Sequence, residues 1–179
     1  MYHMDKKNEA NALVIECITT ALLEMMRKQS FDSITITDLT KRAGVGRVSF
    51  YRNFTSKKEI LARYLDKLLQ EWGSEFESKH DPSFFSESFI RHFYKYKDFY
   101  LLLYRCNLSE MIYESLRQGT KLDDSQNNME RYLKSMTAGM LFGWVDEWMR
   151  QGMPENPDEI ILLSAQAAAA EQAVSKKEV

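Results

Sequence analysis

The chain has 179 residues, of which 44% are hydrophobic and 12% aromatic, and its formal net charge is −2. This length allows one large or two small domains, and the hydrophobic content is sufficient for a buried core. Three prolines and seven glycines are few for a turn-rich sheet protein, so we expect an all-α fold. The sequence has no run of about 18 apolar residues and no apolar stretch behind its polar start, which predicts a cytoplasmic protein without a membrane partner.

The sequence gives no sign of catalytic or metal chemistry. Cys17 and Cys106 lie in apolar runs without paired spacing, so we expect two free thiols. His80 and His92 are twelve residues apart, and no HExxH, P-loop, GxSxG or GxGxxG motif is present. We therefore expect a protein that is not an enzyme and that needs no cofactor or metal.

The first predicted element is an amphipathic helix from about Asn8 to Gln29. Its apolar residues recur at helical spacing, at Val14, Ile18, Ala21, Leu22 and Met25. The segment Ser30-Phe31-Asp32-Ser33 breaks this pattern, and we expect Phe31 to pack beneath the helices that follow.

Two short helices joined by a glycine turn follow this first helix. Thr35 and Asp38 form a capping box that opens the first of them, and Gly44 ends it because glycine accepts the left-handed conformation of a sharp turn. The second runs from Arg47 to Asn53. Phe50 and Phe54 are four residues apart and share a buried face, so the opposite face is basic and hydroxylated.

The stretch from Ser33 to Lys58 is strongly basic within a slightly acidic chain. It holds six lysines and arginines against Asp38 alone, a formal charge of +5. The outward face includes Arg47, Val48, Ser49, Arg52 and Tyr51. A short helix with such a face matches what reading a DNA major groove requires, so we interpret the pair as a helix-turn-helix. By spacing alone, an ordinary helix pair in an all-helical protein explains the pattern equally well.

From Ile34 to Leu61 the sequence resembles the TetR family of bacterial transcription regulators. The resemblance rests on Thr-x-x-Asp-Leu, on Ala-Gly-Val, on a helix that ends Phe-Tyr-x-x-Phe, and on Ser-Lys-Lys-Glu-Ile-Leu. It implies a three-helix DNA-binding head at residues 1–55 and a helical effector-binding and dimerisation body at residues 56–179.

The resemblance also implies roles for individual residues of the head. Thr35 and Thr37 lie near the DNA backbone. The residues that face bases are Arg47, Val48 and Ser49, and those that hold phosphates are Tyr51, Asn53 and Lys57. This chain has Val48-Ser49 where the family often has Gly-Thr, and Asn53 where a histidine is common, so the family's operator sequences do not transfer.

A long helix joins the predicted head to the body. Ser56 and Glu59 form a second capping box, and Leu61, Leu65, Leu68, Trp72 and Phe76 then extend one apolar stripe. A tilt of this long helix would move the predicted helix from Arg47 to Asn53. We hypothesise that the body controls the head in this way. We expect a polar link at 77–82.

The body is predicted to contain five further helices. Three short ones cover about 84–94, 96–104 and 108–117, and a charged loop spans 119–127. Aromatic and methionine side chains are candidates for the lining of an effector pocket, with an ordinary core as the alternative. These residues are Phe89, Phe93, Tyr100, Tyr104, Met111, Met136, Met140 and Trp144.

The last two predicted helices, from about Gln126 to Gln151 and from Pro157 to Ala170, form the expected homodimer face. Gly139 and Gly143 cost about 1 kcal/mol each in a helix interior, which suggests that another helix or a ligand comes close. The segment from Trp148 to Ile160 also resembles a TetR subgroup related to a dihydroxyacetone-kinase activator.

The function that these features predict is a DNA-binding transcriptional regulator. We expect a ligand-responsive repressor that binds a palindromic operator as a dimer. Its partners would be double-stranded DNA, a second copy of the chain and an unidentified small-molecule effector. The alternative is a TetR-like co-activator or adaptor that acts through protein contacts without binding DNA directly.

Overall fold

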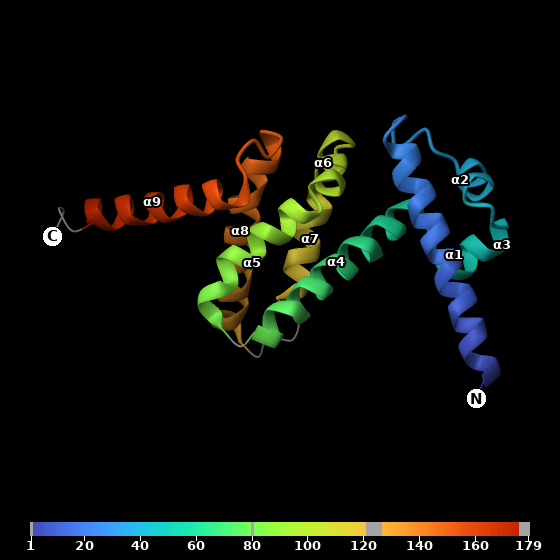
Figure 1. Ribbon diagram of the computed structural model, residues 1–179, viewed down its shortest axis with the longest axis horizontal. Coiled ribbons are helices and arrows are strands. Elements are labelled where there is room, and N and C mark those ends of the chain that lie inside the picture. Colours follow the sequence, from blue (N-terminus) through green and yellow to red (C-terminus); the bar gives the residue numbers. More distant parts are fainter. Residues whose placement is uncertain (1, 80, 121–126, 176–179) are drawn as a thin grey trace.

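A computed structural model describes residues 2–79, 81–120 and 127–175. Within these residues the chain is all-α, as predicted, with nine α-helices and one short 3₁₀ helix, η1 (Figure 1). The α-helices are α1 (Tyr2–Met26), α2 (Ile36–Ala43), α3 (Arg47–Asn53), α4 (Lys57–Lys79), α5 (Phe85–Lys95), α6 (Lys97–Arg105), α7 (Glu110–Gly119), α8 (Asn128–Arg150) and α9 (Pro157–Ser175), and η1 is Pro82–Phe84.

The helices form a head and a body that share α4. Helices α1, α2 and α3 make the head at one end of the molecule, and α4 runs from the head into the body (Figure 1). In the body, α7 packs between α4 and α8, whereas α9 contacts α5 and then projects outward. Head and body are therefore joined through helix packing as well as through the chain.

Several predicted boundaries differ from the structure by a few residues, including the start of the first helix, which is Tyr2 and not about Asn8, and the end of the last, which is Ser175 and not Ala170. The first helix ends at Met26, three residues before the expected end at Gln29. α4 continues to Lys79, through the first half of the segment expected to be a polar link, because residues such as Glu75 and Lys79 are compatible with a helix and form an i,i+4 pair. Residues 121–126 of the predicted charged loop lie outside the described residues.

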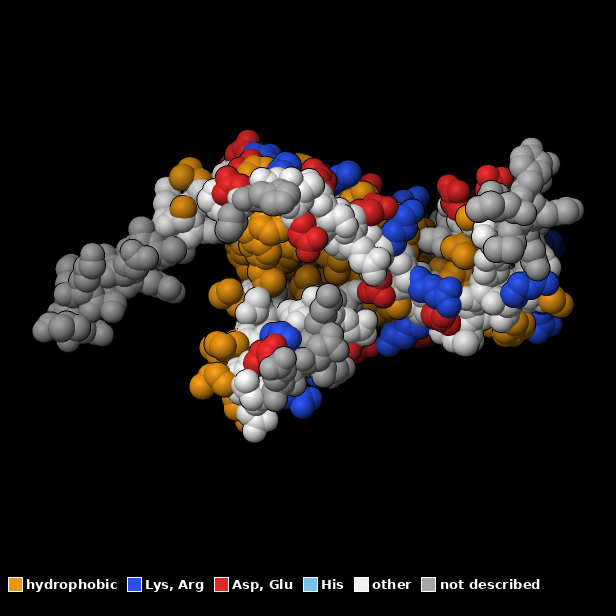
Figure 2. Space-filling view, turned by 90° about the horizontal axis from the view of Figure 1, so that it is seen from below, with side chains coloured by type: hydrophobic (Ala, Val, Ile, Leu, Met, Phe, Trp, Pro, Cys, Tyr) orange, Lys and Arg blue, Asp and Glu red, His pale blue; other side chains and the backbone are white. Residues whose placement is uncertain are grey.

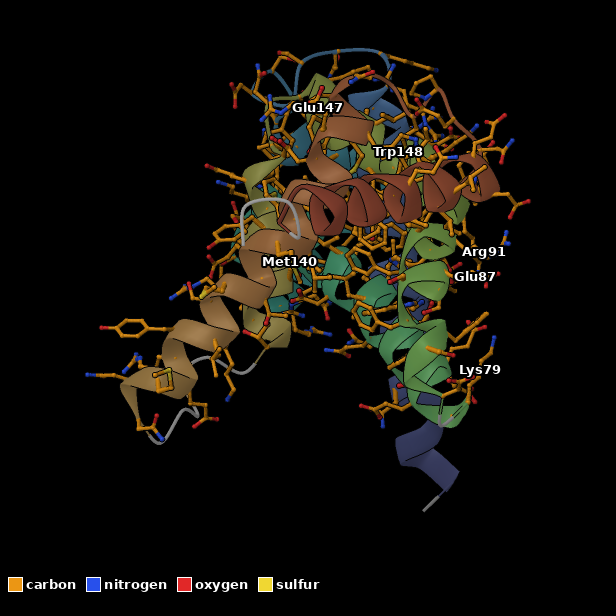
Figure 3. The ribbon with its side chains drawn as sticks, turned by 90° about the vertical axis from the view of Figure 1, so that its left-hand side faces the viewer. Lys79, Glu87, Arg91, Met140, Glu147 and Trp148 are labelled. Atoms are coloured by element: carbon orange, nitrogen blue, oxygen red, sulfur yellow. The ribbon has the colours of Figure 1, made fainter. Side chains whose placement is uncertain are left out.

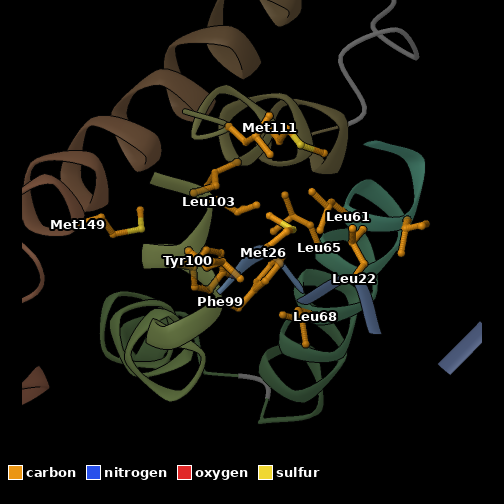
Figure 4. Packing of buried hydrophobic residues seen from close by; sticks show 14 of the residues in the cluster. Leu22, Met26, Leu61, Leu65, Leu68, Phe99, Tyr100, Leu103, Met111 and Met149 are labelled. Carbon is orange, nitrogen blue, oxygen red and sulfur yellow. The ribbon is translucent and has the colours of Figure 1, made fainter. Parts of the chain in front are cut away.

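The hydrophobic core runs without a break from the head into the body. Leu22 and Met26 of α1 lie beside Leu61 and Leu65 of α4, and Tyr100 of α6 lies on the body side of the same cluster (Figure 4). Each of these five side chains is at most 4% exposed. A change in the packing of the body is thus transmitted to α1 and α4 through direct contacts.

His92 is a titratable side chain buried in this core. It is 6% exposed, and its Nε2 lies 2.7 Å from the hydroxyl oxygen of Tyr100. Burial, with a smaller contribution from the charge of Lys95, lowers the pKa of His92 to about 4. Because burial disfavours the imidazolium, the folded protein holds His92 neutral at neutral pH.

His92 should make the fold less stable in mild acid. The unfolded chain binds a proton at His92 below a pH of about 6.5, whereas the folded chain does so only near the lowered pKa of about 4. The contribution of neutral His92 to the free energy of unfolding is therefore fully present above pH 6.5 and is lost as the pH falls from 6.5 to 4. This contribution amounts to about 3 kcal/mol. Urea unfolding at pH 7 and at pH 4 should therefore show a smaller loss for His92→Gln than for the wild type. An equal loss in both proteins would contradict the assignment.

Candidate nucleic-acid interface

The amino terminus of α2 is fixed by the predicted capping box. Thr35 has extended backbone angles, φ −84° and ψ 154°, and its Oγ1 accepts a hydrogen bond from the backbone N–H of Asp38 at 3.0 Å. Its hydroxyl in turn donates to Oδ2 of Asp38 at 2.6 Å. Thr35 and Thr37 are both exposed, so this helix start presents its hydroxyl groups and backbone N–H groups to the outside.

A glycine turn sets α3 at an angle to α2. Gly44 takes the left-handed conformation, with φ 68° and ψ 27°, as the sequence predicted. Its N–H donates to the carbonyl of Lys41 at 3.3 Å, and that of Val45 donates to the carbonyl of Thr40 at 3.0 Å. A side chain at Gly44 would be strained at this φ, so the turn depends on glycine.

α3 buries one face and exposes the other. Phe50 is 0% and Phe54 2% exposed, whereas Val48 is 73% and Tyr51 53% exposed. Arg47 and Arg52 are also exposed, and Ser49 is half-buried. The predicted division of this helix into a core face and a basic outer face is confirmed, and lysine and arginine side chains cover parts of the head surface (Figure 2).

Two of the nine predicted DNA-contact residues point into the head. Asn53 is 9% exposed and donates from Nδ2 to the carbonyl of Ser49 at 2.9 Å. The ammonium of Lys57 donates to the carbonyls of Phe31 and Ile34, at 2.6 and 2.5 Å, and lies 4.5 Å from the centre of the Phe31 ring. The phosphate contacts predicted for Asn53 and Lys57 do not match these positions, because both side chains are engaged by backbone inside the head.

Lys57 has a structural role that the sequence did not reveal. Its two carbonyl contacts tie the first turn of α4 to the connection between α1 and α2. Burial lowers the pKa of its ammonium, and the nearby charge of Asp32 partly opposes this effect. Phe31 was predicted to pack beneath the head, but nothing in the residue spacing indicated that a lysine 26 residues later would hold its carbonyl.

The start of α4 has a second cap. The hydroxyl of Ser56 accepts a hydrogen bond from the N–H of Glu59 at 3.2 Å, and the Glu59 carboxylate accepts from the N–H of Thr55 at 2.7 Å. Mainly through the Thr55 contacts, the pKa of Glu59 falls to about 2. The neighbouring Lys58 points away from the head and pairs with Glu110 of α7 at 2.8 Å.

The eight residues proposed to line an effector pocket do not surround one space. Phe89, Phe93 and Tyr100 are 0% exposed and belong to the core. Met136 and Met140, in contrast, are 70% and 69% exposed on α8, and Figure 3 shows Met140 on the outer side of that helix. A single pocket built from all eight is therefore not formed.

The remaining three predicted lining residues have separate surroundings. Tyr104 donates a hydrogen bond to Asp146 of α8, and Trp144 donates from Nε1 to the hydroxyl of Ser164 in α9 at 2.8 Å. Met111 is 8% exposed and lies at the boundary between α7 and α4. It lines a cavity between these two helices, and Tyr104 lines a different one beside Arg27 at the end of α1.

α8 carries an exposed apolar stripe that its own chain does not cover. Large hydrophobic side chains repeat along its first half, and each is at least 56% exposed. They are Met129, Tyr132, Leu133, Met136 and Met140. Added Cβ atoms at Gly139 and Gly143 would meet nothing within 4 Å, so none of the described parts of the protomer lies close to these glycines. Leu162 and Leu163 of α9 are exposed as well.

The described residues hold neither a metal-binding cluster nor a helix that could span a membrane. Among them, no group of three or more histidine, cysteine, aspartate and glutamate side chains is placed to hold a metal ion. None of the helices in this part of the chain combines the length and apolar character needed to cross a membrane.

Two family models match the chain. The model of the bacterial regulatory proteins of the tetR family matches residues 18–64, which include α2, α3 and the start of α4. The model of a transcriptional regulator C-terminal region matches residues 80–168, which cover most of the body. Neither model identifies the dihydroxyacetone-kinase activator subgroup, so that resemblance stays a prediction.

A solved structure has the same fold. The crystal structure of Lin0861 from Listeria innocua superposes with a TM-score of 0.73 over 88% of this chain and 90% of that chain, at 16% sequence identity. At this identity the likeness concerns the fold alone. No curated protein matches the sequence.

The adjacent lysines at the start of α4 offer a matched test of the head. Lys57→Met should lower the free energy of unfolding by about 1.5–3 kcal/mol, because it removes charge-assisted hydrogen bonds to two carbonyls. Lys58→Met should change it by less than about 1 kcal/mol, because an exposed ion pair contributes little. Urea denaturation followed by circular dichroism measures both. Equal effects of the two substitutions would contradict the anchoring role of Lys57.

Proposed function

Because the chain belongs to the TetR family and is a DNA-binding transcriptional regulator, we propose that it is a ligand-responsive repressor that binds a palindromic operator as a homodimer. The observation that carries the proposal is the exposed outer face of α3, held over the buried Phe50 and Phe54. A narrow helix with a fixed orientation and donors on its outer face fits the major groove. The proposal places the protein in the cytoplasm, with the bacterial DNA.

Seven side chains of the head form the proposed DNA surface. Arg47, Val48 and Ser49 at the start of α3 face the bases, and a guanidinium at Arg47 suits the two acceptors on a guanine edge. Tyr51 and Arg52 reach the phosphates on either side. Thr35 and Thr37 at the start of α2 approach the backbone, where helix N–H groups favour phosphate.

The proposed homodimer rests on the exposed stripe of α8. Five large apolar side chains on one helix are an unusual surface for a monomer, and such patches mark interaction sites. The open space at Gly139 and Gly143 lets the backbone of a second helix approach closely. Leu162 and Leu163 extend the patch onto α9. A two-fold pair would place its two heads about 34 to 36 Å apart, in successive major grooves of a palindromic site.

The effector is proposed to act through α4. This helix starts one short connection after α3, and its residues Leu61 and Leu65 belong to the core that continues into α6. A ligand that favours one of two packings of α4 would change the position of α3 on the DNA. The proposal requires that the two packings differ in affinity for the operator.

Arg47→Ala is the direct test of the proposed DNA surface. Fragments of the source genome that the wild-type protein retains should be selected, and binding measured by fluorescence anisotropy at several salt concentrations. The substitution should weaken binding by about 1–3 kcal/mol, because it removes a base contact in the groove. Wild-type affinity should fall steeply with salt, as expected when lysines and arginines displace ions from the phosphates.

Arg105→Ala is the charge-matched control for this experiment. Arg105 is exposed at the end of α6, outside the head, so its removal should leave DNA binding nearly unchanged. An equal loss of DNA affinity in the two variants would show that Arg47 is not part of the proposed DNA surface. If the wild type retains no fragment in a salt-dependent manner, the repressor proposal fails and the adaptor alternative is favoured.

Met140→Glu tests the dimer. A carboxylate in the centre of the proposed apolar interface would be buried without a partner, which should weaken association by several kcal/mol. Sedimentation velocity at micromolar concentration should give a dimer for the wild type and a monomer for this variant. Lys67→Glu, which introduces the same side chain on the exposed face of α4, should remain dimeric. A wild-type protein that sediments as a monomer would refute the proposed assembly.

A further inference from the structure

A cavity of about 450 Å³ lies between α4 and α7, next to the head. This volume is within the range of small-molecule sites. The cavity is lined along α4 by Lys58, Glu59, Ala62 and Asp66, and along α7 by Glu110, Met111, Tyr113, Glu114, Ser115 and Gln118. It is separate from the DNA surface and from the exposed stripe of α8.

The lining is acidic, and one of its carboxylates has no cationic partner. Three of the four pair with lysine or arginine: Glu59 with Arg63, Glu110 with Lys58 and Glu114 with Arg117. Asp66 forms no ion pair with any residue that the structure describes, although it is partly buried. An ammonium that donates to Asp66 would give this carboxylate the charge-assisted partner that the other three already have.

Asp66 is also held in place for such a contact. The hydroxyl of Ser115, which is 7% exposed, donates a hydrogen bond to Oδ1 of Asp66. This contact fixes the carboxylate across the seam between α4 and α7 and leaves Oδ2 available. An ammonium that donates to Oδ2 would complete the set of contacts.

The remaining lining suits an apolar body attached to that ammonium. Met111 faces the α4 side chains Leu61 and Leu65 (Figure 4), and Tyr113 adds a half-buried ring. Methionine adapts to ligands of varied shape, and a tyrosine face attracts a cation. A metal ion fits less well, because the described residues contain no cluster of three or more histidine, cysteine, aspartate or glutamate side chains that could hold one.

We propose that the cavity between α4 and α7 binds an organic amine, with its ammonium on Asp66 and its apolar part against Met111 and Tyr113. This inference rests on the proposed function, since it assigns a site and a chemical class to the effector. At the rim, the ion pair of Lys58 with Glu110 joins the first turns of α4 and α7. A ligand between the two helices would therefore act on α4 close to where it leaves the head.

Three phenyl compounds of similar size but different charge test the proposal on the full-length protein. They are 2-phenylethylamine, the neutral 2-phenylethanol and the anionic 3-phenylpropionate. Isothermal titration calorimetry at constant ionic strength should show saturable binding of the amine, with a dissociation constant at least about tenfold lower than for either other probe. Equal binding of the alcohol, or no saturable binding of the amine, would overturn the proposal.

Asp66→Asn then locates the binding site. This nearly isosteric change should raise the dissociation constant of 2-phenylethylamine about tenfold or more, whereas Asp98→Asn on the exposed start of α6 should leave it unchanged. Circular dichroism checks that each variant is folded. If Asp66→Asn does not fold, Glu114→Gln at the exposed edge of the cavity should still weaken amine binding about threefold. Unchanged binding in the folded variants would place the amine elsewhere and overturn the proposal.

The DNA experiment separates this inference from the proposed function. If the wild type binds its genomic fragment but not the amine, the site assignment fails while the repressor proposal stands. If the amine binds at Asp66 but the chain retains no DNA, the repressor proposal fails while the site stands.

Discussion

The burial of Phe50 and Phe54 is the constraint on which the proposed DNA surface depends. α3 has only seven residues, and an isolated helix of that length is unstable in water. Gly46 at its start supplies no side-chain hydrogen bond, so capping adds little. The two phenyl rings, at 0% and 2% exposure, therefore hold the helix against the head core. Because the buried face stabilises the helix, the residues on the opposite face are not needed for packing. That face can therefore consist of arginine, tyrosine and an exposed valine.

α4 extends this constraint to the rest of the molecule. Its early residues Ile60 and Leu61 and its later residues Leu65 and Leu68 belong to one continuous core. Lys57 at its first turn holds the carbonyls of Phe31 and Ile34, so the connection between α1 and α2 must follow any tilt of α4. A movement started in the body is thus expected to turn the head as a unit, because the start of α4 cannot slide past the other head helices without breaking these contacts.

Local sequence signals predicted the architecture of the head and the order of the body helices. The capping box at Thr35, the left-handed Gly44 and the spacing of Phe50 and Phe54 are short-range patterns with one physical meaning each, and the structure has all of them. The contacts of Lys57 and Asn53 with backbone carbonyls could not be predicted, because a carbonyl has no signature in the sequence. The same limitation applies to Asp66, whose contact with Ser115 spans 49 residues.

The surroundings of the eight candidate pocket residues could not be predicted, because helical periodicity shows that a face is apolar but not what covers it. Phe89 and Met140 belong to similar stripes, yet one is 0% and the other 69% exposed. The difference arises from packing, since α5 lies against α4 and α9 while the first half of α8 leaves its stripe uncovered. A stripe that covers the protomer's own core and one that stays exposed in the protomer are indistinguishable in sequence.

The position of α7 connects the proposed dimer to the proposed amine site. α7 packs on α4 along one side and on α8 along the other. In a dimer built on α8, the position of each head relative to the two-fold axis would be transmitted through α8, α7 and α4 in turn. An amine between α4 and α7 would alter one link in this series while leaving the α8 interface intact. If both heads of such a dimer enter major grooves about 34 to 36 Å apart, a small change at that seam in both protomers would disfavour the operator complex.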